Sequence, residues 1–420
     1  MGVLFVMESL RELYRIGRGP SSSHTMGPSH AATLFRRAFP QAERFQAVLY
    51  GSLAKTGKGH LTDVAIQDAF APLPTEILWE RETPEESLPH PNTMELLAFQ
   101  GEEQLGRWRV FSVGGGKIEI EGQPSVAPQD VYPLSTFQEI KEYCQREGKF
   151  LWQYVEENEG PEIWDYLRDV WKQMKATVYA GLNTEGVLHG GLGVQRKAKY
   201  LVRQRHMDES PETRENRKVC AYAFAVSEEN AGGGVVVTAP TCGASGVLPA
   251  VLVFKQEQLG FSDRDMLHAL AAAGIVGNII KTNASISGAE CGCQAEIGTA
   301  SAMAAGALVA LRDGTGQQIG HAVAMALKNL MGLVCDPVAG LVEVPCVKRN
   351  VIGAVNAISA ADMALAGIES RIPVDEVIDA MGQVGRRMPV EFRETALGGL
   401  AATPTGRRVK QQMQPGAPEF

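Results

Sequence analysis

Cysteine is the residue type in this sequence with the most specific chemistry, and four of the seven cysteines lie between positions 291 and 346. Cys291 and Cys293 stand in SGAECGCQAEIG (287–298), and Cys335 and Cys346 in GLVCDPVAGLVEVPC (332–346). Their spacing matches neither the C-x₂-C pairs of zinc ribbons nor the common ferredoxin patterns. Proline beside Cys335 and Cys346 indicates turns that can aim a thiolate, and ECGCQAE is polar for a helix packed in a core. Two interpretations stay open: a metal site, or free thiols that only fill buried space.

The bulk composition argues against several classes of protein. The 420-residue chain is 45% hydrophobic and carries a formal net charge of −8, which suits a core of two or three domains. It has no long basic run, so we expect no nucleic-acid partner. No apolar run reaches the roughly 18–20 residues of a membrane span, and the segments 269–280 and 300–311 are expected to be buried core helices. The N-terminal stretch lacks the marks of a signal peptide and the cysteine count is odd, which favours a cytoplasmic protein without a disulfide framework.

The elements that must position the cysteines fall into two parts, and the fold class that we expect is α+β. Short β-rich segments between turns occupy positions 45–120, with FQAVLYGSL as the first strand, which predicts an N-terminal α/β domain with a mixed sheet over residues 1–130. From Thr136, which we expect to cap a helix, apolar residues recur at every third or fourth position. This period predicts a larger, mostly α-helical catalytic domain over residues 131–420. Its glycine-rich connections, such as APTCGASG (239–246), are candidates to line a site.

At the level of whole motifs, the chain resembles a known family. The motifs, in chain order, are GPSSSHTMGP, GSLAKTGKGHLTD, HPNTM, SVGGGKI, HGGLGVQRKA, SGAECGCQAEIGTASAMAAG, CDPVAGLVEVPC, RN and ETALGGLAATPTG. They are similar to those of the iron–sulfur-dependent bacterial L-serine dehydratases (L-serine ammonia-lyases), in the single-chain form with a β-type domain before the α-type catalytic domain. The resemblance implies a [4Fe–4S] cluster held by Cys293, Cys335 and Cys346, with Cys291 as a neighbour that does not ligate. It also implies a homodimer.

The reaction implied by the resemblance converts L-serine to pyruvate and ammonia. It has two difficult events, the loss of a weakly acidic Cα proton and the departure of the β-hydroxyl group. An iron without a fourth cysteine could act as a Lewis acid on that hydroxyl. Motif matching makes His60 the base, a role that suits a side chain with a pKa near 6.5, and we expect Asp63 to orient it. The alternative for His60 is a solvated histidine in an extended loop.

The stretch GPSSSHTMGPSH (19–30) concentrates hydroxyls and imidazoles between two Gly-Pro pairs. Given the resemblance, we expect it to form a loop that surrounds the carboxylate and ammonium groups of L-serine. Its alternative role is the cap of a following helix, and both can hold because a helix N-terminus also binds carboxylates. The family more often has Asn where this chain has Cys242, so we expect no amide contact there. The predicted substrate-binding residues are Ser21, Ser22, Ser23, His24, Thr25, Thr241, Lys281, Asn283 and Ser287.

Other functions remain as alternatives at this stage. A related L-cysteine desulfidase would share a three-cysteine cluster, and comparing the two substrates would separate it from the serine enzyme. A redox or iron-sensing protein would need a fourth cysteine ligand, which Cys291 or Cys242 would have to supply. An amino-acid-binding protein without catalysis would bind L-serine and release no pyruvate. A pyridoxal-phosphate enzyme is disfavoured because no motif secures a Schiff-base lysine.

Overall fold

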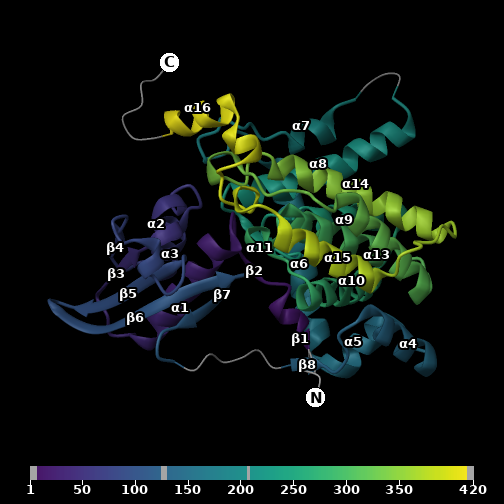
Figure 1. Cartoon of the computed structure of the whole chain (residues 1–420), viewed down its shortest axis with the longest axis horizontal. Coiled ribbons are helices and arrows are strands. Elements are labelled where there is room, and N and C mark those ends of the chain that lie inside the picture. The colour runs from purple at the N-terminus through teal and green to yellow at the C-terminus, as the bar shows by residue number, and fades with distance from the viewer. Residues whose placement is uncertain (1–6, 124–129, 206–208, 414–420) are drawn as a thin grey trace. The chain divides into compact units, whose positions relative to one another are not determined.

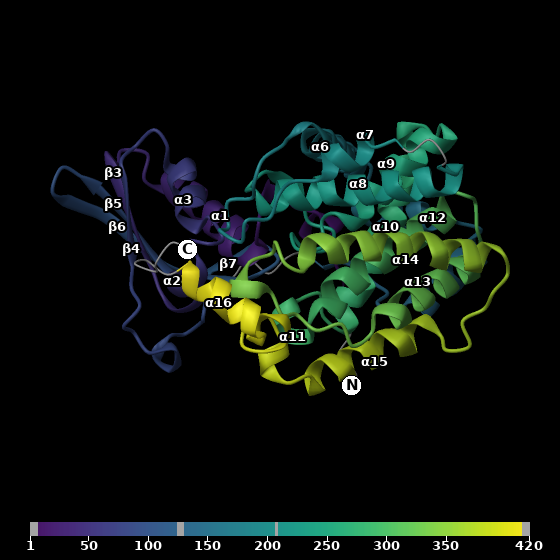
Figure 2. The same ribbon diagram turned by 90° about the horizontal axis from the view of Figure 1, so that it is seen from above.

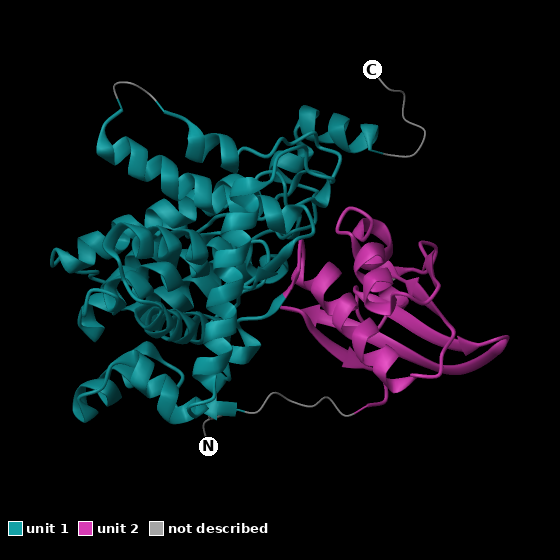
Figure 3. Ribbon diagram, turned by 180° about the vertical axis from the view of Figure 1, so that it is seen from behind, with its two compact units in different colours: residues 1–16, 128–420 teal, residues 17–127 magenta. Residues whose placement is uncertain are grey.

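The computed structural model describes residues 7–123, 130–205 and 209–413, and the chain divides into two compact units. The smaller unit is Gly17–Ala127, and the larger one joins Met1–Ile16 to Pro128–Phe420 (Figure 3). We had expected domains of 1–130 and 131–420; the units place the first sixteen residues with the helical part. We predicted from the N-terminal stretch that the chain has no signal peptide. The first six residues of that stretch, 1–6, lie outside the described residues.

A mixed five-stranded sheet forms the frame of the smaller unit. The strand order is β4-β3-β5-β6-β7, in which β3 and β4 are parallel and all other neighbours are antiparallel. Along β3, buried and partly buried residues alternate, as expected for a sheet with one face against a core. The strands are β3 (Arg44–Leu49), β4 (Thr75–Trp79), β5 (Thr93–Gln100), β6 (Glu103–Gly114) and β7 (Lys117–Ile120).

Three helices complete this unit: α1 (Gly27–Ala38), α2 (Gly51–Thr56) and α3 (Thr62–Phe70). Phe35 of α1, Phe45 of β3 and Phe70 of α3 form the aromatic centre of the core, and the rings of Phe45 and Phe70 stack 4.0 Å apart. The prediction of a strand through FQAVLYGSL is wrong at its end, because Gly51 has a φ of +52° and starts α2. The turn between α2 and α3 carries His60.

The larger unit is a helical assembly whose long helices lie beside one another, as α13 and α14 do in both views (Figures 1 and 2). Its helices are α4 (Phe137–Glu147), α5 (Leu151–Glu159), α6 (Ile163–Asn183), α7 (Ala198–Arg203), α8 (Pro211–Ala231), α9 (Val247–Leu259), α10 (Asp263–Asn283), α11 (Gly288–Cys291), α12 (Thr299–Ala310), α13 (Gly316–Leu330), α14 (Cys346–Leu365), α15 (Val374–Arg387) and α16 (Pro404–Gln412). Its short strands are β1 (Met7–Glu8), paired with β8 (Asp130–Tyr132), and β9 (Val235–Val237); β2 (Ile16–Arg18) begins where the units divide. The fold class is α+β, as predicted.

The centre of the larger unit is made from helices with small side chains. Helix α12 is buried from Thr299 to Val309, and α10 is buried along most of its length, which confirms the expectation of core helices. A Cβ at Gly277 would lie 2.8 Å from the sulfur of Met303, so α10 and α12 approach closely only because this position has no side chain. No helix in the described ranges is long and apolar enough to cross a membrane. Thr136 caps α4 in a reciprocal capping box with Glu139, as expected.

Candidate functional site

Three cysteines from separate segments come together in the larger unit. Cys293 lies in the turn between α11 and a short π-helical segment (Gln294–Gly298), Cys335 lies in a loop, and Cys346 is the first residue of α14. All three are buried. The side chains of Cys335 and Cys346 both interact with that of Cys293, and possible ligand atoms of Cys293, Cys335 and Glu296 lie within 4.8 Å of one another. The fold therefore concentrates soft sulfur donors that are far apart in the sequence.

The backbone separates Cys291 from this group. Gly292 has a φ of +74° and ends α11, so the chain turns between the two cysteines of ECGC. A Cβ at Gly385 of α15 would overlap the Cys291 sulfur, which shows that this thiol packs against α15. Burial raises the pKa of the Cys291 thiol, which also interacts with Ser285. This placement supports the assignment of Cys293, and not Cys291, to the thiol site.

Cys335 has no helix of its own and is held by the C-terminal part of the chain. Its N–H donates to the Phe392 carbonyl and its carbonyl accepts from the Glu394 N–H, each at 2.8 Å. The next residue, Asp336, accepts from the Leu400 N–H at 2.8 Å. A Cβ at Gly288 would lie 3.3 Å from the Cys335 sulfur, so the start of α11 covers the other side. Backbone pairing thus fixes a loop thiol as firmly as a helical position would.

Arg349 places a positive charge beside the thiols. It follows Cys346 by one helical turn, and its Nη1 is 3.5 Å from the Cys293 sulfur and 2.8 Å from the Val334 carbonyl. Its Nη2 donates to Asp336 Oδ1 at 2.8 Å in a largely buried ion pair. The two neighbouring thiols and then the Arg349 guanidinium hold the pKa of Cys293 well below its usual range. The same contacts and burial raise the pKa values of Cys335 and Cys346.

Thr241 is the predicted substrate-binding residue that the fold brings closest to this group. Its Oγ1 donates to Glu296 Oε1 at 2.6 Å, and Glu296 follows Cys293 by three residues. Removal from water and the negative charge of Cys293 raise the pKa of Glu296 well above its usual range. A protonated Glu296 can donate a hydrogen bond, whereas an ionised one can only accept.

The other candidates of the larger unit have different surroundings. Lys281 forms a 2.6 Å ion pair with Glu8, and the Asn283 amide donates to the carbonyls of Ser135 and Ile279. Neither side chain hydrogen bonds to the three thiols within the described ranges, so both serve as tethers between segments. Ser287 is the residue before α11 and makes no side-chain cap bond, and its carbonyl accepts the Cys291 N–H at 2.9 Å. Ser287 is therefore connected to the segment that carries Cys293 by the backbone of α11, and not by a side-chain contact with the thiols.

A second polar group belongs to the smaller unit. The rings of His24 and His60 are both buried, with centroids 4.7 Å apart. Thr25 Oγ1 donates to the His60 carbonyl at 2.8 Å, and Thr62 Oγ1 donates to the His24 carbonyl at 2.6 Å. These reciprocal bonds hold the SSSHT segment against the turn before α3. The structure thus brings together two motifs that are widely separated in the sequence.

The hydrogen bonds of the two imidazoles indicate their protonation. His60 Nδ1 is 3.0 Å from the Thr56 carbonyl, which only accepts, so Nδ1 carries the proton and Nε2 has the lone pair in the neutral ring. His24 contacts the hydroxyls of Ser23 and Ser52, each at 2.9 Å. Burial, and then the charge of His60, hold the pKa of His24 well below its usual range. The pair therefore accommodates at most one positive charge near neutral pH.

The SSSHT segment forms a tight turn at a helix start and not an open loop. Ser21 Oγ accepts the His24 N–H at 3.1 Å, which is the helix-cap role that we considered. Ser22 opens the turn, and its carbonyl accepts the Gly27 N–H that continues into α1. The hydroxyl oxygens of Ser21 and Ser23 are 3.3 Å apart, within hydrogen-bond distance. Both expected roles remain compatible, since a capped N-terminus is also a place where carboxylates bind.

The sequence predicts an extended loop at Asp63. The structure instead places this residue in the first turn of α3. Its carboxylate accepts the Val64 N–H at 3.0 Å. This local bond is typical of a carboxylate at a helix start, where it complements the helix dipole. It gives no support to the predicted role of orienting His60.

Several residues around both groups were missed in the sequence. Arg349 stands three positions after Cys346, and Glu296 three positions after Cys293; both spacings place side chains on the same face of a helix. That signal was available, although charged residues on helices usually face solvent. His24 as the ring partner of His60 had no sequence signal, because only the fold brings the two together.

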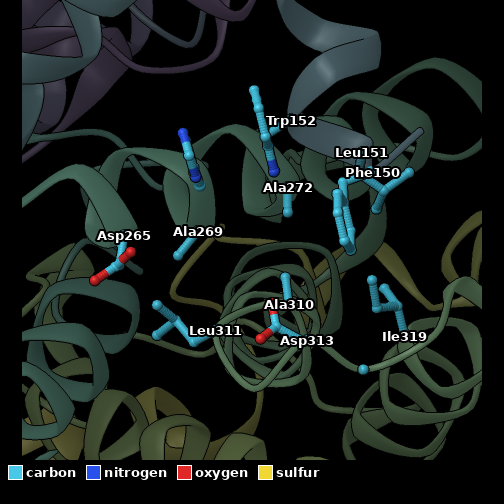
Figure 4. Close-up of a pocket in the computed structure, with 12 residues that line it drawn as sticks. Phe150, Leu151, Trp152, Asp265, Ala269, Ala272, Ala310, Leu311, Asp313 and Ile319 are labelled. Atoms are coloured by element: carbon cyan, nitrogen blue, oxygen red, sulfur yellow. The ribbon is translucent and has the colours of Figure 1, made fainter. Parts of the chain in front are cut away.

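One pocket of the larger unit lies elsewhere. Residues from α5, α10, α12 and α13 and the turn after α12 line it, among them Trp152, stacked on His268 at 4.0 Å, and the carboxylates of Asp265 and Asp313 (Figure 4). None of the predicted site residues lines it. The pocket therefore does not mark the thiol site.

Comparison with known proteins covers almost the whole chain. The serine dehydratase alpha chain family model matches residues 91–401, and the serine dehydratase beta chain model matches residues 9–72. A protein of Streptomyces coelicolor named L-serine dehydratase is 38% identical, over 94% of this chain and 98% of the relative. L-serine dehydratase 1 of Escherichia coli is 39% identical, over 94% and 99% of the two chains. L-serine dehydratase of Haemophilus influenzae is 36% identical over the same shares. The first family match contains the three thiols, and the second contains both histidines.

Proposed function

The chain belongs to the serine dehydratase family, as its motifs indicated, and on that premise we propose that it is an L-serine ammonia-lyase. The reaction converts one L-serine to one pyruvate and one ammonia. In this proposal Cys293, Cys335 and Cys346 hold a [4Fe–4S] cluster, and His60 removes the Cα proton. The single observation that carries the proposal is the convergence of three buried thiols from separate segments beside a partly buried guanidinium.

The residues present fit such a cluster chemically. Thiolates are soft ligands that select iron–sulfur clusters, zinc or copper(I) over hard cations. Cys291, the other thiol of the ECGC motif, faces α15, so that motif offers one cysteine to the group and not two. Three cysteines leave one iron without a thiolate, whereas an electron-transfer cluster has four. When bound through three cysteines, the cluster supplies one iron that can act as a Lewis acid toward the substrate hydroxyl.

Arg349 and its partner prepare the thiol site electrostatically. Three thiolates in a buried place carry negative charge that is expensive to bury without compensation. The guanidinium of Arg349 supplies a fixed positive charge 3.5 Å from the Cys293 sulfur, and Asp336 and the Val334 carbonyl fix its orientation. These bonds hold the guanidinium beside the donor set before any cluster is inserted.

The histidine pair supports the role of a base. Because Nδ1 of His60 donates to the Thr56 carbonyl, Nε2 is the atom that can accept the Cα proton. His24 is kept neutral by burial and by its neighbour, so a proton taken by His60 does not meet a second charge. Ser21, Ser22 and Ser23 are the proposed donors toward the substrate carboxylate, together with the N–H groups of their turn. Thr25, whose hydroxyl donates to the His60 carbonyl, acts in this proposal by holding the turn against His60.

The family resemblance also implies finer properties that we include in the proposal. In this proposal the enzyme works in the cytoplasm as a homodimer. Its small-molecule partner is the substrate, L-serine. Sedimentation of the cluster-loaded protein tests the dimer, since a monomer of 45.3 kDa and its dimer differ twofold in mass. A single species with the monomer mass would overturn that part.

The test of the function is an anoxic assay. We would purify the protein without oxygen, reconstitute it with iron and sulfide, and measure pyruvate from L-serine before and after exposure to air. We expect activity that is lost in air. We expect His60→Asn to lower kcat by about 10²- to 10⁴-fold, the usual contribution of a general base. The control is His321→Asn on α13, whose ring contacts Gln317 and Ser370, and it should leave kcat unchanged.

The remaining functions predict other results in the same assay. Sulfide release from L-cysteine without pyruvate from L-serine would identify a desulfidase. A cluster-loaded protein that is inactive on both substrates would favour the redox role. L-Serine binding by calorimetry without turnover would identify an amino-acid-binding protein.

A further inference from the structure

The loop before α9 lies between the two ligand-bearing helical segments of the thiol site. This loop, residues 241–246 (TCGASG), is folded on itself, because the N–H and Oγ of Ser245 both donate to the Cys242 carbonyl, at 3.1 and 2.7 Å. At one end, Thr241 donates to Glu296 in the segment that carries Cys293. Its other end meets α14, which packs against α9.

Asn350 makes the connection to α14. The side chain is 1% exposed, and its amide nitrogen donates to the Gly243 carbonyl at 2.8 Å and to the Cys346 carbonyl at 2.9 Å. Its amide oxygen accepts the Gly246 N–H at 2.9 Å. Both amide hydrogens and the oxygen are therefore used, and they join the loop to the residue that carries the third thiol.

Each ligand-bearing segment is thus tied to the same loop by a side chain one turn after its cysteine. Glu296 follows Cys293 by three residues, and Asn350 follows Cys346 by four. The loop thus connects the segments that carry two thiols which have no direct backbone bond with each other. Arg349 on α14 makes a separate contact with the Cys293 sulfur and has no bond to the loop.

We propose that Asn350 is a positioning residue that locks the 241–246 loop to α14 and thereby sets how firmly the Cys293 and Cys346 thiols retain a metal group. The identity of the metal group, a [4Fe–4S] cluster, rests on the proposed function. The connection of the loop to α14 through Asn350 does not depend on that function. Asn is required in place of the near-isosteric Asp, because a carboxylate would face the carbonyl oxygens of Gly243 and Cys346 in a buried place.

The chain contains a matched control in the same helix. Asn356 also uses its whole amide, donating to Ser301 Oγ at 2.9 Å and the Ala326 carbonyl at 3.0 Å, and accepting from Asn329 at 2.8 Å. Its partners lie on α12 and α13 and not in the loop. Replacing Asn356 therefore disturbs the packing of α14 and leaves the loop connection intact.

The experiment has two readouts on four variants: Asn350→Ala, Asn350→Asp, Asn356→Ala and Asn356→Asp. In metal-free reduced protein, the Gly246 N–H should exchange faster in Asn350→Ala, because that variant lacks the side-chain oxygen that accepts it. The acceleration should be smaller in Asn350→Asp, because a carboxylate oxygen can still accept this N–H. In protein reconstituted with iron and sulfide, iron release to a chelator should be about 10- to 100-fold faster in both Asn350 variants, the usual effect of disturbing groups behind metal ligands. Both Asn356 variants should match the parent protein in both readouts.

The outcomes separate the two proposals. A parent protein that takes up no iron overturns the proposed cluster, and the exchange pattern alone then decides whether Asn350 locks the loop. Iron release or exchange that changes equally in the Asn350 and Asn356 variants would mean that Asn350 only stabilises α14, which overturns the positioning role. If Asn350→Ala does not fold, Asn350→Asp carries the comparison.

Discussion

The ion pair between Arg349 and Asp336 offers a quantitative test of how the thiol site is built. We consider the change Arg349→Met in the metal-free protein. It removes the 2.8 Å bond to Asp336, the 2.8 Å bond to the Val334 carbonyl and the charge beside the Cys293 sulfur. Asp336 is then left buried, with one oxygen bonded to the Leu400 N–H and the other without its partner.

The size of the effect follows from burial. Breaking one side of a buried ion pair costs about 3–5 kcal/mol, because the remaining charge is uncompensated. The variant Asp336→Asn leaves Arg349 with its Val334 bond and the Cys293 sulfur, so its cost is smaller. In the double variant the uncompensated charge of Asp336 is gone. We therefore expect a coupling energy of about 1–3 kcal/mol between the two positions.

The measurement is the local opening free energy of α14 by hydrogen exchange, for the parent, both single variants and the double variant. A global unfolding curve is less suited, since a chain of two units need not unfold in one step. The reasoning would be refuted if the single effects add to the double effect within about 0.5 kcal/mol, the range found for independent sites.

Three further predictions address the two polar groups. Cys293→Ser should abolish iron uptake on reconstitution, whereas Cys291→Ser should retain it, and equal iron contents would contradict the separation of the two thiols by Gly292. Gly385→Ala places a methyl group into the Cys291 thiol and should destabilise the larger unit by about 1–3 kcal/mol, seen as a lower melting temperature; an unchanged one would mean that α15 can move away. The native pKa of His24 is depressed, so below the unfolded value of about 6.5 the unfolded state binds more protons, and stability is lost as the pH falls from there toward the native value. Melting temperatures between pH 7 and 5 should therefore fall less steeply in His24→Gln, and parallel curves would contradict this origin.

The order of elements could be predicted where the signal is local. The start of α4 was readable from Thr136 and the apolar period after it, and the alanine- and glycine-rich segments were readable as core helices. The end of the first strand was not, because Gly51 leaves the strand through a positive φ that a β-rich pattern does not reveal. Local patterns specify local conformation only.

The association of residues 1–16 with the helical unit depends on distant partners. Tyr14 donates to the Leu270 carbonyl at 2.9 Å, and Asn278 and Lys281 bond to Glu8. Such contacts join positions more than 250 residues apart, and no local pattern contains them. They also explain why Lys281, chosen for its place just before the cysteines, bonds to the N-terminal segment.

The thiol site shows which part of a site a sequence can reveal. Cys293, Cys335 and Cys346 could be singled out by type and by family motif, but their spacing said nothing of their contact. Residue types that hold the site in place, such as arginine and asparagine, are common on solvated helices. Their role became visible only with their partners.

The same local arrangement occurs at two of the three cysteines of the thiol site. Cys293 and Cys346 each stand at the start of a helical segment, and a polar side chain one turn later reaches out to a different segment. Glu296 and Asn350 reach the 241–246 loop in this way, and Arg349 reaches the loop of Cys335. Because side chains three or four residues apart lie on one helix face, a ligand and its support are set together by a single helical turn. Cys335, which lies in a loop, is held instead by backbone hydrogen bonds to Phe392 and Glu394, so the C-terminal segment takes the place of a helix in positioning this thiol.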